Sequence, residues 1–203
     1  MPRHAVVPAL ALALALALAT AVYAAGDLAQ ARAAFEREDY AKAYALYAPL
    51  AAQADPEAQY RVGLMLKFGW GVDKDLAAAA RSFRQAGEKG HAESQAELGR
   101  LYKDGRGVTE DAAEAARWLR RAADAGVGIA QLNLGRLYKD GSGVPRDLAE
   151  AYAWFTLAAA NGYMDGMSYR TRLQQEMTPE QVREGERLAA ERAGRSTQMR
   201  EKK

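Results

Sequence analysis

The sequence predicts an all-α protein, a right-handed α-solenoid of stacked helical hairpins with helical caps at both ends. Three observations lead to this fold class. The segment 101–111 recurs almost unchanged at 137–147, and it reads L-Y-K-D-G-R-G-V-T-E-D. Glycines at 63, 99 and 135 are spaced by 36 residues (99 − 63 = 135 − 99). The intervening segments carry apolar residues at helical spacing. A fixed period of this length is typical of repeat arrays, in which stacking of the units buries the core.

Residues 1–24 have the layout of a cleavable signal peptide. A basic start, M-P-R-H, is followed by an uncharged apolar stretch and by the small residues of Val22-Tyr23-Ala24. We expect cleavage after Ala24, with Ala25 as the near alternative. The rival interpretation is an uncleaved membrane anchor, because the stretch approaches the length that spans a bilayer. With cleavage, the mature protein is expected to be periplasmic or secreted, without stable membrane insertion.

The segment 25–53 is expected to form an N-terminal capping hairpin of two helices. Its turn is short and lies around Glu38 and Asp39, and it lacks the glycine-rich loop of the later phrases. A solenoid needs terminal units that differ from its middle units, and this segment fits that role.

The segment 54–163 is expected to hold three repeats. Laid residue on residue, 91–126 and 127–162 agree at 19 of 36 positions. Within a unit, Gln95, Leu98, Gly99 and Tyr102 fall on one face of a first helix, and an alanine-rich stripe marks the second. A glycine inside a helix costs about 1 kcal/mol relative to alanine, so the recurring one predicts that another backbone approaches closely. The tryptophans of the second helices, Trp118 and Trp154, are expected in the core.

The repeated phrase itself is predicted to be a structural loop. Gly105 would end the first helix in a left-handed conformation, Gly107 would allow a second reversal, and Asp111 would cap the second helix. A phosphate-binding loop is disfavoured because no third glycine and no strand accompany the pair. A calcium loop is disfavoured because glycine, arginine and valine isolate Asp104 and Asp111, and Phe68 replaces Asp104 in the first unit.

Two capping helices are expected over 164–193. Thr178 is a good helix cap and Pro179 suits the first helical position. The polar residues 194–203 are expected to be a flexible tail.

Several chemistries are disfavoured by composition. The chain has no cysteine, which removes disulfides, thiol nucleophiles and cysteine metal sites. The single histidine after residue 24, His91, occupies the position of Val127 and Tyr163, so a packing or surface role is expected. Without further histidines a zinc site is not expected, and the sequence predicts no cofactor and no enzyme. A carboxylate-pair glycosidase is a formal alternative, although the glutamates lie at solvent-type helical positions. The formal net charge of +2 gives no ground for nucleic-acid binding.

A family resemblance follows from the repeated pattern. A-x-x-x-L-G-x-L-Y-x-x-G-x-G-V-x-x-D, followed by A-x-x-W-x-x-x-A-A-x-x-G, resembles the Sel1-like repeat, a relative of the tetratricopeptide repeat. The copies at 94–126 and 130–162 match best, and the copy at 58–90 has Ser82 for tryptophan and Leu66 for tyrosine. The resemblance implies a non-enzymatic adaptor or scaffold in multi-protein assemblies, including those of the bacterial envelope.

A partner would then be expected on the concave face, which first helices line in such arrays. We call the basic residues that recur there the basic ladder: Lys67, Lys103, Lys139, Arg100 and Arg136. Three polar residues of the same helices could add contacts: Gln95, Gln131 and Asn133. The alternative for the lysines is structural, because the helix dipole favours a cation at any helix C-terminus.

Two functions are therefore compatible with the sequence. The first is a periplasmic adaptor that binds a protein or peptide in the solenoid groove. The second is an envelope factor that binds or processes cell-wall glycan. The sequence names neither a partner nor an oligomeric state.

Overall fold

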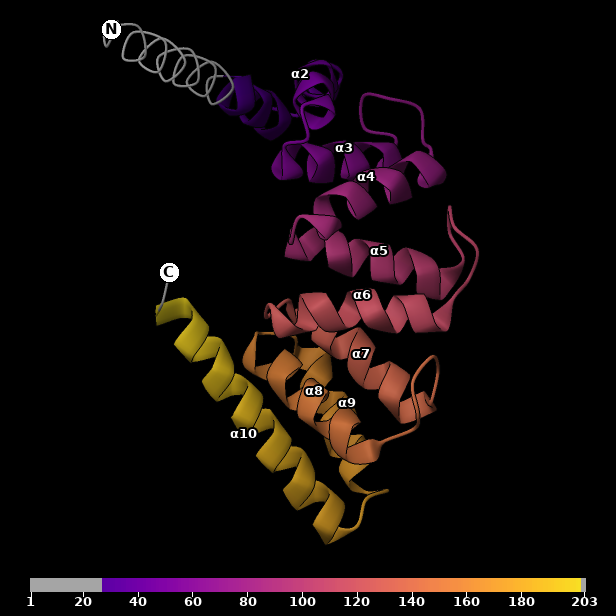
Figure 1. Ribbon diagram of the computed structural model, residues 1–203, viewed down its shortest axis with the longest axis vertical. Coiled ribbons are helices and arrows are strands. Elements are labelled where there is room, and N and C mark those ends of the chain that lie inside the picture. Colours follow the sequence, from indigo (N-terminus) through magenta and orange to yellow (C-terminus); the bar gives the residue numbers. More distant parts are fainter. Residues whose placement is uncertain (1–26, 202–203) are drawn as a thin grey trace, which may run out of the picture.

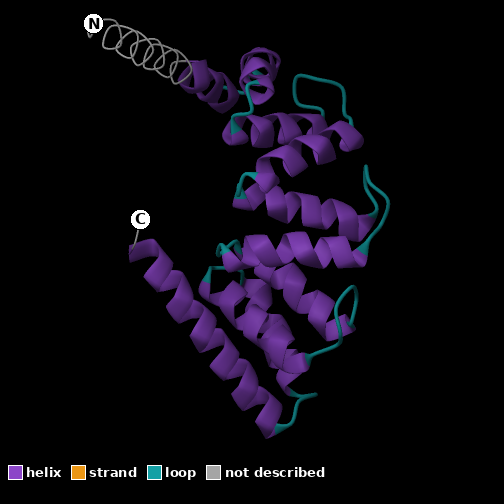
Figure 2. Cartoon of the chain, in the orientation of Figure 1, coloured by secondary structure: helices purple, strands orange, loops and turns teal. Residues whose placement is uncertain are grey.

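The computed structural model describes residues 27–201, with side chains described up to residue 195. The predicted signal peptide, 1–24, lies outside the described residues. Figures 1 and 2 show helices stacked one after another along the long axis, joined by loops. No strand occurs between residues 27 and 201. The prediction of an all-α repeat solenoid is confirmed, whereas its handedness stays a prediction.

The helices follow the expected order. A helix at 27–36 is followed by α2, and then by three pairs in which a first helix, a loop and a second helix succeed one another. The elements are α2 (Tyr40–Ala52), α3 (Pro56–Phe68), α4 (Leu76–Glu88), α5 (Ala92–Asp104), α6 (Ala112–Asp124), α7 (Gly128–Asp140), α8 (Leu148–Ala160), α9 (Met164–Gln174) and α10 (Pro179–Glu201). Each of α2 to α8 spans 13 residues.

The second helices begin at aspartates, as the sequence predicts. The carboxylate of Asp111 accepts the backbone N–H of Glu114 at 2.9 Å, and Asp75 and Asp147 cap α4 and α8 in the same way. The same register extends further back than the sequence analysis recognised. Asp39 lies 36 residues before Asp75 and caps α2 through the N–H of Lys42. The second helix of the N-terminal hairpin is therefore built like those of the repeats.

Each loop contains two glycines with different tasks. Gly105 ends α5 with φ of 62°, which is the left-handed cap expected from the sequence. Gly107, with φ of 74°, lies against the preceding unit, because a Cβ there would be 2.3 Å from the carbonyl oxygen of Leu76. Gly71 and Gly143 meet the starts of α2 and α6 in the same manner. The second glycine thus makes a contact between units as well as a chain reversal.

The glycines inside the first helices correct one expectation. A Cβ at Gly99 would lie 2.7 Å from the Cγ of Leu119, and one at Gly135 would lie 2.7 Å from the ring of Phe155. Gly63 meets the Phe83 ring at 2.5 Å. The close neighbour is therefore mainly a large side chain of the second helix rather than a second backbone. The glycine makes room for that side chain within its own hairpin.

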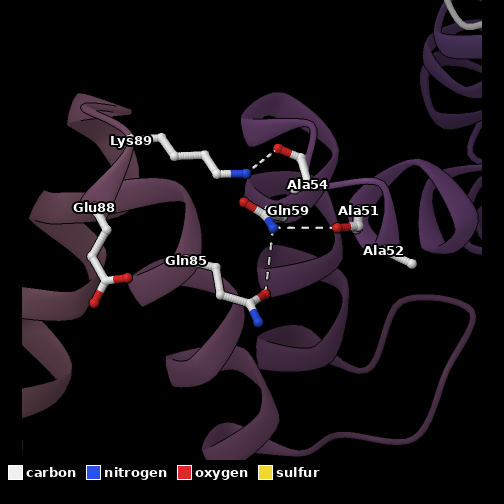
Figure 3. Close-up of a pocket in the computed structure, with 7 residues that line it drawn as sticks. All are labelled: Ala51, Ala52, Ala54, Gln59, Gln85, Glu88 and Lys89. Atoms are coloured by element: carbon white, nitrogen blue, oxygen red, sulfur yellow. Dashed lines mark hydrogen bonds between the residues drawn. The ribbon is translucent and has the colours of Figure 1, made fainter.

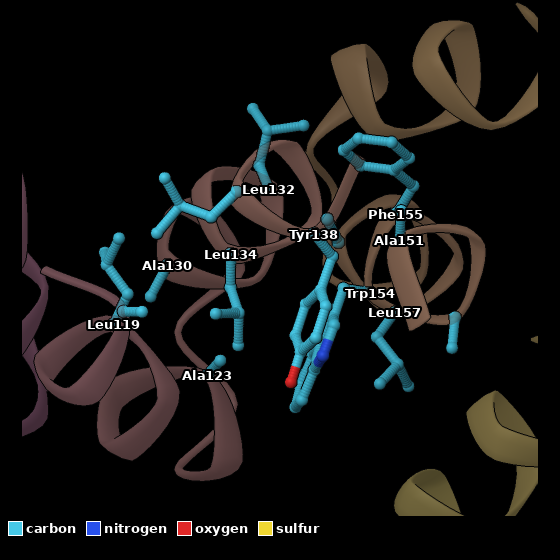
Figure 4. Packing of buried hydrophobic residues seen from close by; sticks show 14 of the residues in the cluster. Leu119, Ala123, Ala130, Leu132, Leu134, Tyr138, Ala151, Trp154, Phe155 and Leu157 are labelled. Atoms are coloured by element: carbon cyan, nitrogen blue, oxygen red, sulfur yellow. The ribbon is translucent and has the colours of Figure 1, made fainter. Parts of the chain in front are cut away.

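The buried apolar residues form two clusters, an N-terminal and a C-terminal one, and each includes residues of α5 and α6. Leu119, Trp154 and Phe155 are almost fully buried, and Figure 4 shows them with the alanines of α6 and α8 around α7. The indole N–H of Trp154 donates to the Oε2 of Glu150 at 3.1 Å, so the tryptophan is satisfied at its polar end. Both predicted core tryptophans are buried, since Trp118 is only 5% exposed.

The C-terminal helix is longer than the sequence predicts. Residues 194–201, expected in a flexible tail, continue α10 to Glu201. A single helical glycine, Gly194, costs only about 1 kcal/mol, and the ion pair between Arg195 and Glu191 (3.1 Å) supports the same turns. Arg192 of α10 forms an ion pair with Glu150 of α8, with 2.7 Å between its guanidinium and the carboxylate. In the part of the chain that the structure describes, no helix has the length and apolarity needed to cross a membrane.

Candidate functional site

The basic ladder does not form one exposed row. Lys67 is only 6% exposed, and its Nζ lies 2.6 Å from the Oε2 of Glu97 on the next first helix. Its ammonium also lies 4.7 Å from the centroid of the Phe68 ring. This lysine therefore links α3 to α5, and the expectation that it is exposed to a partner is wrong.

The two glutamines of the predicted site are also buried. Gln95 Nε2 donates to the carbonyl oxygen of Gly87 at 2.8 Å, and Gln131 Nε2 donates to that of Ala123 at 3.1 Å. Gln59 makes the equivalent bond to Ala51. Each acceptor lies at the C-terminal end of the preceding second helix, where carbonyl groups lack partners within the helix. The glutamines join consecutive units, and their predicted exposure is corrected.

Asn133 is likewise turned inward. The residue is 6% exposed, and its Nδ2 donates to the carbonyl oxygen of Ile129 at 2.8 Å, one turn earlier in α7. The buried amide is therefore satisfied by its own helix, and it offers little to a partner in this arrangement.

The arginines of the ladder are the accessible members. The Arg100 side chain is 37% exposed and pairs with Glu97 at 3.2 Å, while Arg136 is exposed with its guanidinium 5.6 Å from the centroid of Tyr169. The structure adds a residue that the sequence analysis missed. Arg172 on α9 is exposed and lies 36 residues after Arg136, so the step continues into the C-terminal cap. We call Arg100, Arg136 and Arg172 the arginine row.

The lysines beside the row are less available. Lys103 is half-buried and its Nζ lies 2.8 Å from the carboxylate of Asp104, the next residue. Lys139 is also half-buried, and its backbone carbonyl accepts from the Nε of Arg146 in the following loop. Both stand in the last turn of a first helix, where the dipole favours a cation.

His91 has the structural role that its position predicts. Its Nδ1 accepts the backbone N–H of Ser94 at 3.2 Å and thereby caps α5. Its ring stacks on Tyr60 with centroids 4.6 Å apart. Burial raises the pKa of Tyr60, and the nearby Glu97 raises it further. A histidine whose acceptor nitrogen holds a helix N-terminus is not arranged as a general base.

Near His91, Glu57 and Arg61 form an ion pair on one face of α3. The Nε of Arg61 donates to the Oε1 of Glu57 at 2.8 Å. Burial raises the pKa of Glu57, but the hydrogen bond and charge of Arg61, with Arg32 and His91, more than offset it, so that the pKa is lowered. This carboxylate is held in its charged form, which is unsuited to a general acid.

Two hollows lie at the edge where a second helix ends and the next first helix begins. The larger, of about 470 Å³, is lined by Ala51, Ala52, Ala54, Gln59, Gln85, Glu88 and Lys89 (Figure 3). The smaller, of about 270 Å³, lies at the corresponding place two units on and is lined by Ala123, Asp124, Gln131, Trp154, Leu157, Arg192 and Arg195. Sequence reasoning singled out neither, because their lining residues vary from unit to unit.

Charged residues of both signs, Asp124, Arg192 and Arg195, line the smaller hollow. Partial burial raises the pKa of Asp124, and the charges of Arg120, Arg192 and Arg195 lower it only in part. Arg192 is committed to Glu150, and its guanidinium lies 4.4 Å from the centroid of Trp154. This hollow therefore belongs mainly to the attachment of α10. Among the described residues, no group of three acidic or histidine side chains is placed to hold a metal ion.

Comparison with known proteins agrees with this architecture. The Sel1 repeat family model matches residues 56–91, 92–127 and 128–163. A solved protective antigen present in uropathogenic Escherichia coli strains, which displays an SLR fold, is 32% identical with a TM-score of 0.71. The alignment covers 79% of this chain and 36% of that one. A solved Sel1 repeat protein from Oxalobacter formigenes is 28% identical with a TM-score of 0.66, covering 70% and 58%. The chain thus spans less than two thirds of either protein. No curated protein matches significantly.

Proposed function

The chain belongs to the Sel1 repeat family, whose members generally mediate protein–protein interactions and are generally non-enzymatic, and we propose that it is a binding adaptor of the bacterial envelope. Its partner is a protein that presents an acidic segment to the first-helix face. We further propose that the chain itself has no catalytic activity. The predicted signal peptide supports a periplasmic location.

The arginine row is the observation that carries this proposal. Arg100, Arg136 and Arg172 occupy one repeat position on α5, α7 and α9. Arg136 and Arg172 are exposed and Arg100 is partly exposed, whereas Lys67 is buried. A guanidinium binds a carboxylate through two parallel hydrogen bonds, so a row of three suits an extended acidic segment.

The acidic neighbours of the row do not prevent such binding. Glu97 already pairs with Arg100, but an ion pair at this exposure is worth about 1 kcal/mol or less. A partner carboxylate can exchange with Glu97 at little cost. The neighbouring acid also disfavours partners that present only one negative charge.

The proposal is tested by crosslinking capture from envelope extract. Tagged mature protein is compared with the triple variant Arg100→Ala, Arg136→Ala, Arg172→Ala, and captured proteins are identified by mass spectrometry. We expect the wild type to capture partners that the triple variant loses. A matched control, Arg183→Ala with Arg187→Ala and Arg195→Ala, removes the same charge from exposed positions of α10 and should capture normally.

Two results would overturn this function. One is equal capture by the wild type and the arginine-row variant. The other is the absence of any captured protein while the mature chain sediments with purified cell-wall polymer. That second result would favour the glycan-binding alternative.

A further inference from the structure

The larger hollow departs from the repeat pattern at its rim. The turn residue there is Ala54, whereas the equivalent residues of the later units are Gly90, Gly126 and Gly162. Ala54 has φ of 69°, in the left-handed region that an alanine adopts only at a cost. Backbone strain of this kind is kept where the surroundings require it, and it gathers at binding sites.

The second departure is an unpaired acceptor on Gln59. This residue is 3% exposed, and its Nε2 donates to the carbonyl oxygen of Ala51 at 3.2 Å and to the Oε1 of Gln85 at 3.5 Å. Its own Oε1 is buried without a hydrogen-bond partner. The amide orientation is fixed, because the Ala51 carbonyl can only accept. In Figure 3 this oxygen lies on the side of Gln59 that faces Lys89.

The third unit shows which group satisfies the equivalent acceptor. There the Oε1 of Gln131 accepts from the Nδ2 of Asn161 at 2.8 Å. Asn161 lies 30 residues after Gln131, and the residue 30 positions after Gln59 is Lys89 (161 − 131 = 89 − 59). Lys89 donates instead to the carbonyl oxygen of Ala54. The carboxamide that completes the third unit therefore has no counterpart from the chain in the first.

We propose that this hollow binds a carboxamide, the side chain of an asparagine or glutamine in a partner polypeptide. The carboxamide NH₂ donates to Gln59 Oε1, in the way that Asn161 donates to Gln131. Its oxygen accepts from Lys89 Nζ, which is exposed and leaves the Ala54 carbonyl to do so. A volume of about 470 Å³ holds such a side chain together with neighbouring main chain on the alanine-lined wall. That the occupant is a polypeptide rests on the proposed function.

The burial of the acceptor favours a terminal NH₂ group. The nitrogen of an acetamido sugar carries a ring carbon, which would have to enter the enclosed space beside Gln59. A primary carboxamide has two N–H donors and an oxygen on one small end, and so reaches both Gln59 and Lys89. A carboxylate of the same shape has no N–H to donate, and its oxygens would face the oxygen of Gln59.

The test is a titration of the mature protein followed by nuclear magnetic resonance of the Gln59 side-chain amide. The probe is acetyl-Ala-Asn-Ala-N-methylamide, and the matched peptides carry aspartate or alanine in the middle. We expect the asparagine peptide to shift the Gln59 signals. The aspartate and alanine peptides should bind at least about tenfold more weakly, because neither satisfies the buried acceptor.

A variant makes the assignment specific. Lys89→Asn places in the first unit the residue that the third unit carries, so it should raise the thermal unfolding midpoint and lose at least about nine tenths of the peptide affinity. Lys74→Asn, at an exposed lysine of the first loop, should change neither. Unchanged peptide binding by Lys89→Asn, or equal binding of the asparagine and aspartate peptides, would overturn the proposal.

The two proposals fail separately. If proteins are captured through the arginine row but the asparagine peptide does not shift the Gln59 signals, the carboxamide site is overturned and the adaptor function stands. If the peptide shifts the Gln59 signals but no arginine-dependent capture occurs, partner binding by the arginine row is overturned and the carboxamide site stands. If N-acetylglucosamine oligomers shift Gln59 and the peptide does not, the polypeptide occupant is overturned.

Discussion

The side-chain amide of Gln95 donates to the backbone carbonyl of Gly87 over 2.8 Å, and this bond joins the end of one hairpin to the start of the next. The same bond recurs from Gln59 to Ala51 and from Gln131 to Ala123. Repeat arrays gain much of their stability from interfaces between neighbouring units. The glutamines supply a directional, buried bond between α2 and α3, between α4 and α5, and between α6 and α7.

Replacing Gln95 should therefore destabilise the array. Gln95→Leu removes the buried side-chain hydrogen bond to the Gly87 carbonyl, which still accepts the backbone N–H of Gly90, so the loss should be about 0.5–1.5 kcal/mol. Denaturant unfolding followed by circular dichroism measures the loss. Gln174→Leu, at an exposed position of α9, is the matched control and should stay within about 0.5 kcal/mol of wild type. Equal stability of both variants would show that the bond contributes nothing.

Three glycine-to-alanine variants should lose stability to different extents, in a fixed order. At Gly90 the new methyl meets no atom within 4 Å. Only the left-handed φ of 89° should lower the stability, by about 1 kcal/mol. At Gly99 it crowds the Leu119 side chain, which costs about 1–3 kcal/mol. At Gly107 it would overlap the backbone carbonyl of Leu76, and φ is left-handed as well, so this variant should be the least stable. Thermal unfolding of the three proteins gives the order, and any other ranking contradicts these packing roles.

The lysines of the basic ladder should contribute unequally to stability, because Lys67 is buried and Lys103 is only half-buried. Lys67→Ala removes the nearly buried partner of Glu97, which keeps only its contact with Arg100, so we expect a loss of about 1–3 kcal/mol. Lys103→Ala removes a partly exposed contact to Asp104 and should cost less than about 1 kcal/mol. Unfolding free energies from urea titration measure both. A larger loss for Lys103→Ala would reverse the assignment.

Acid should weaken the fold partly through Glu57. Its pKa in the folded protein lies below the ordinary value of 4.5, so its stabilising contribution is complete above pH 4.5 and is lost as the pH falls through the lower folded value. Glu57→Gln should therefore be less stable than wild type at pH 7, by about 1 kcal/mol or less, and the difference should shrink below pH 4.5. Urea unfolding at several pH values tests this. A difference that grows in acid would contradict it.

The repeat array could be predicted from the sequence because the residues that begin and end its helices act locally. A glycine at a helix end and an aspartate at a helix start act on their own neighbourhood, so Gly105 and Asp111 could be assigned from spacing alone. The length of α10 could not be predicted, because Gly194 and the polar composition argue against a helix there. The ion pair between Arg195 and Glu191 nevertheless supports the helix in this region.

The candidate site was harder to predict, because exposure depends on the neighbouring unit. Gln95 and Lys67 lie at positions that a single helix would leave in solvent, yet each meets a group from the adjacent hairpin. Arg172 was within reach of the same spacing argument, had the step of 36 been continued into 164–174. The unpaired oxygen of Gln59 required the structure, because only the side-chain partners of Gln131 show what the first unit lacks.

The central claim is that the partner binds along the first helices. Site-specific photo-crosslinking tests it most directly, with one photoreactive residue at a time replacing Arg100, Arg136 or Arg172, and with Arg117 on α6, whose side chain is 73% exposed, as the second-helix control. We predict that the same protein is crosslinked from the three positions of the arginine row and not from position 117. Crosslinking from 117 at equal or greater yield would contradict the account.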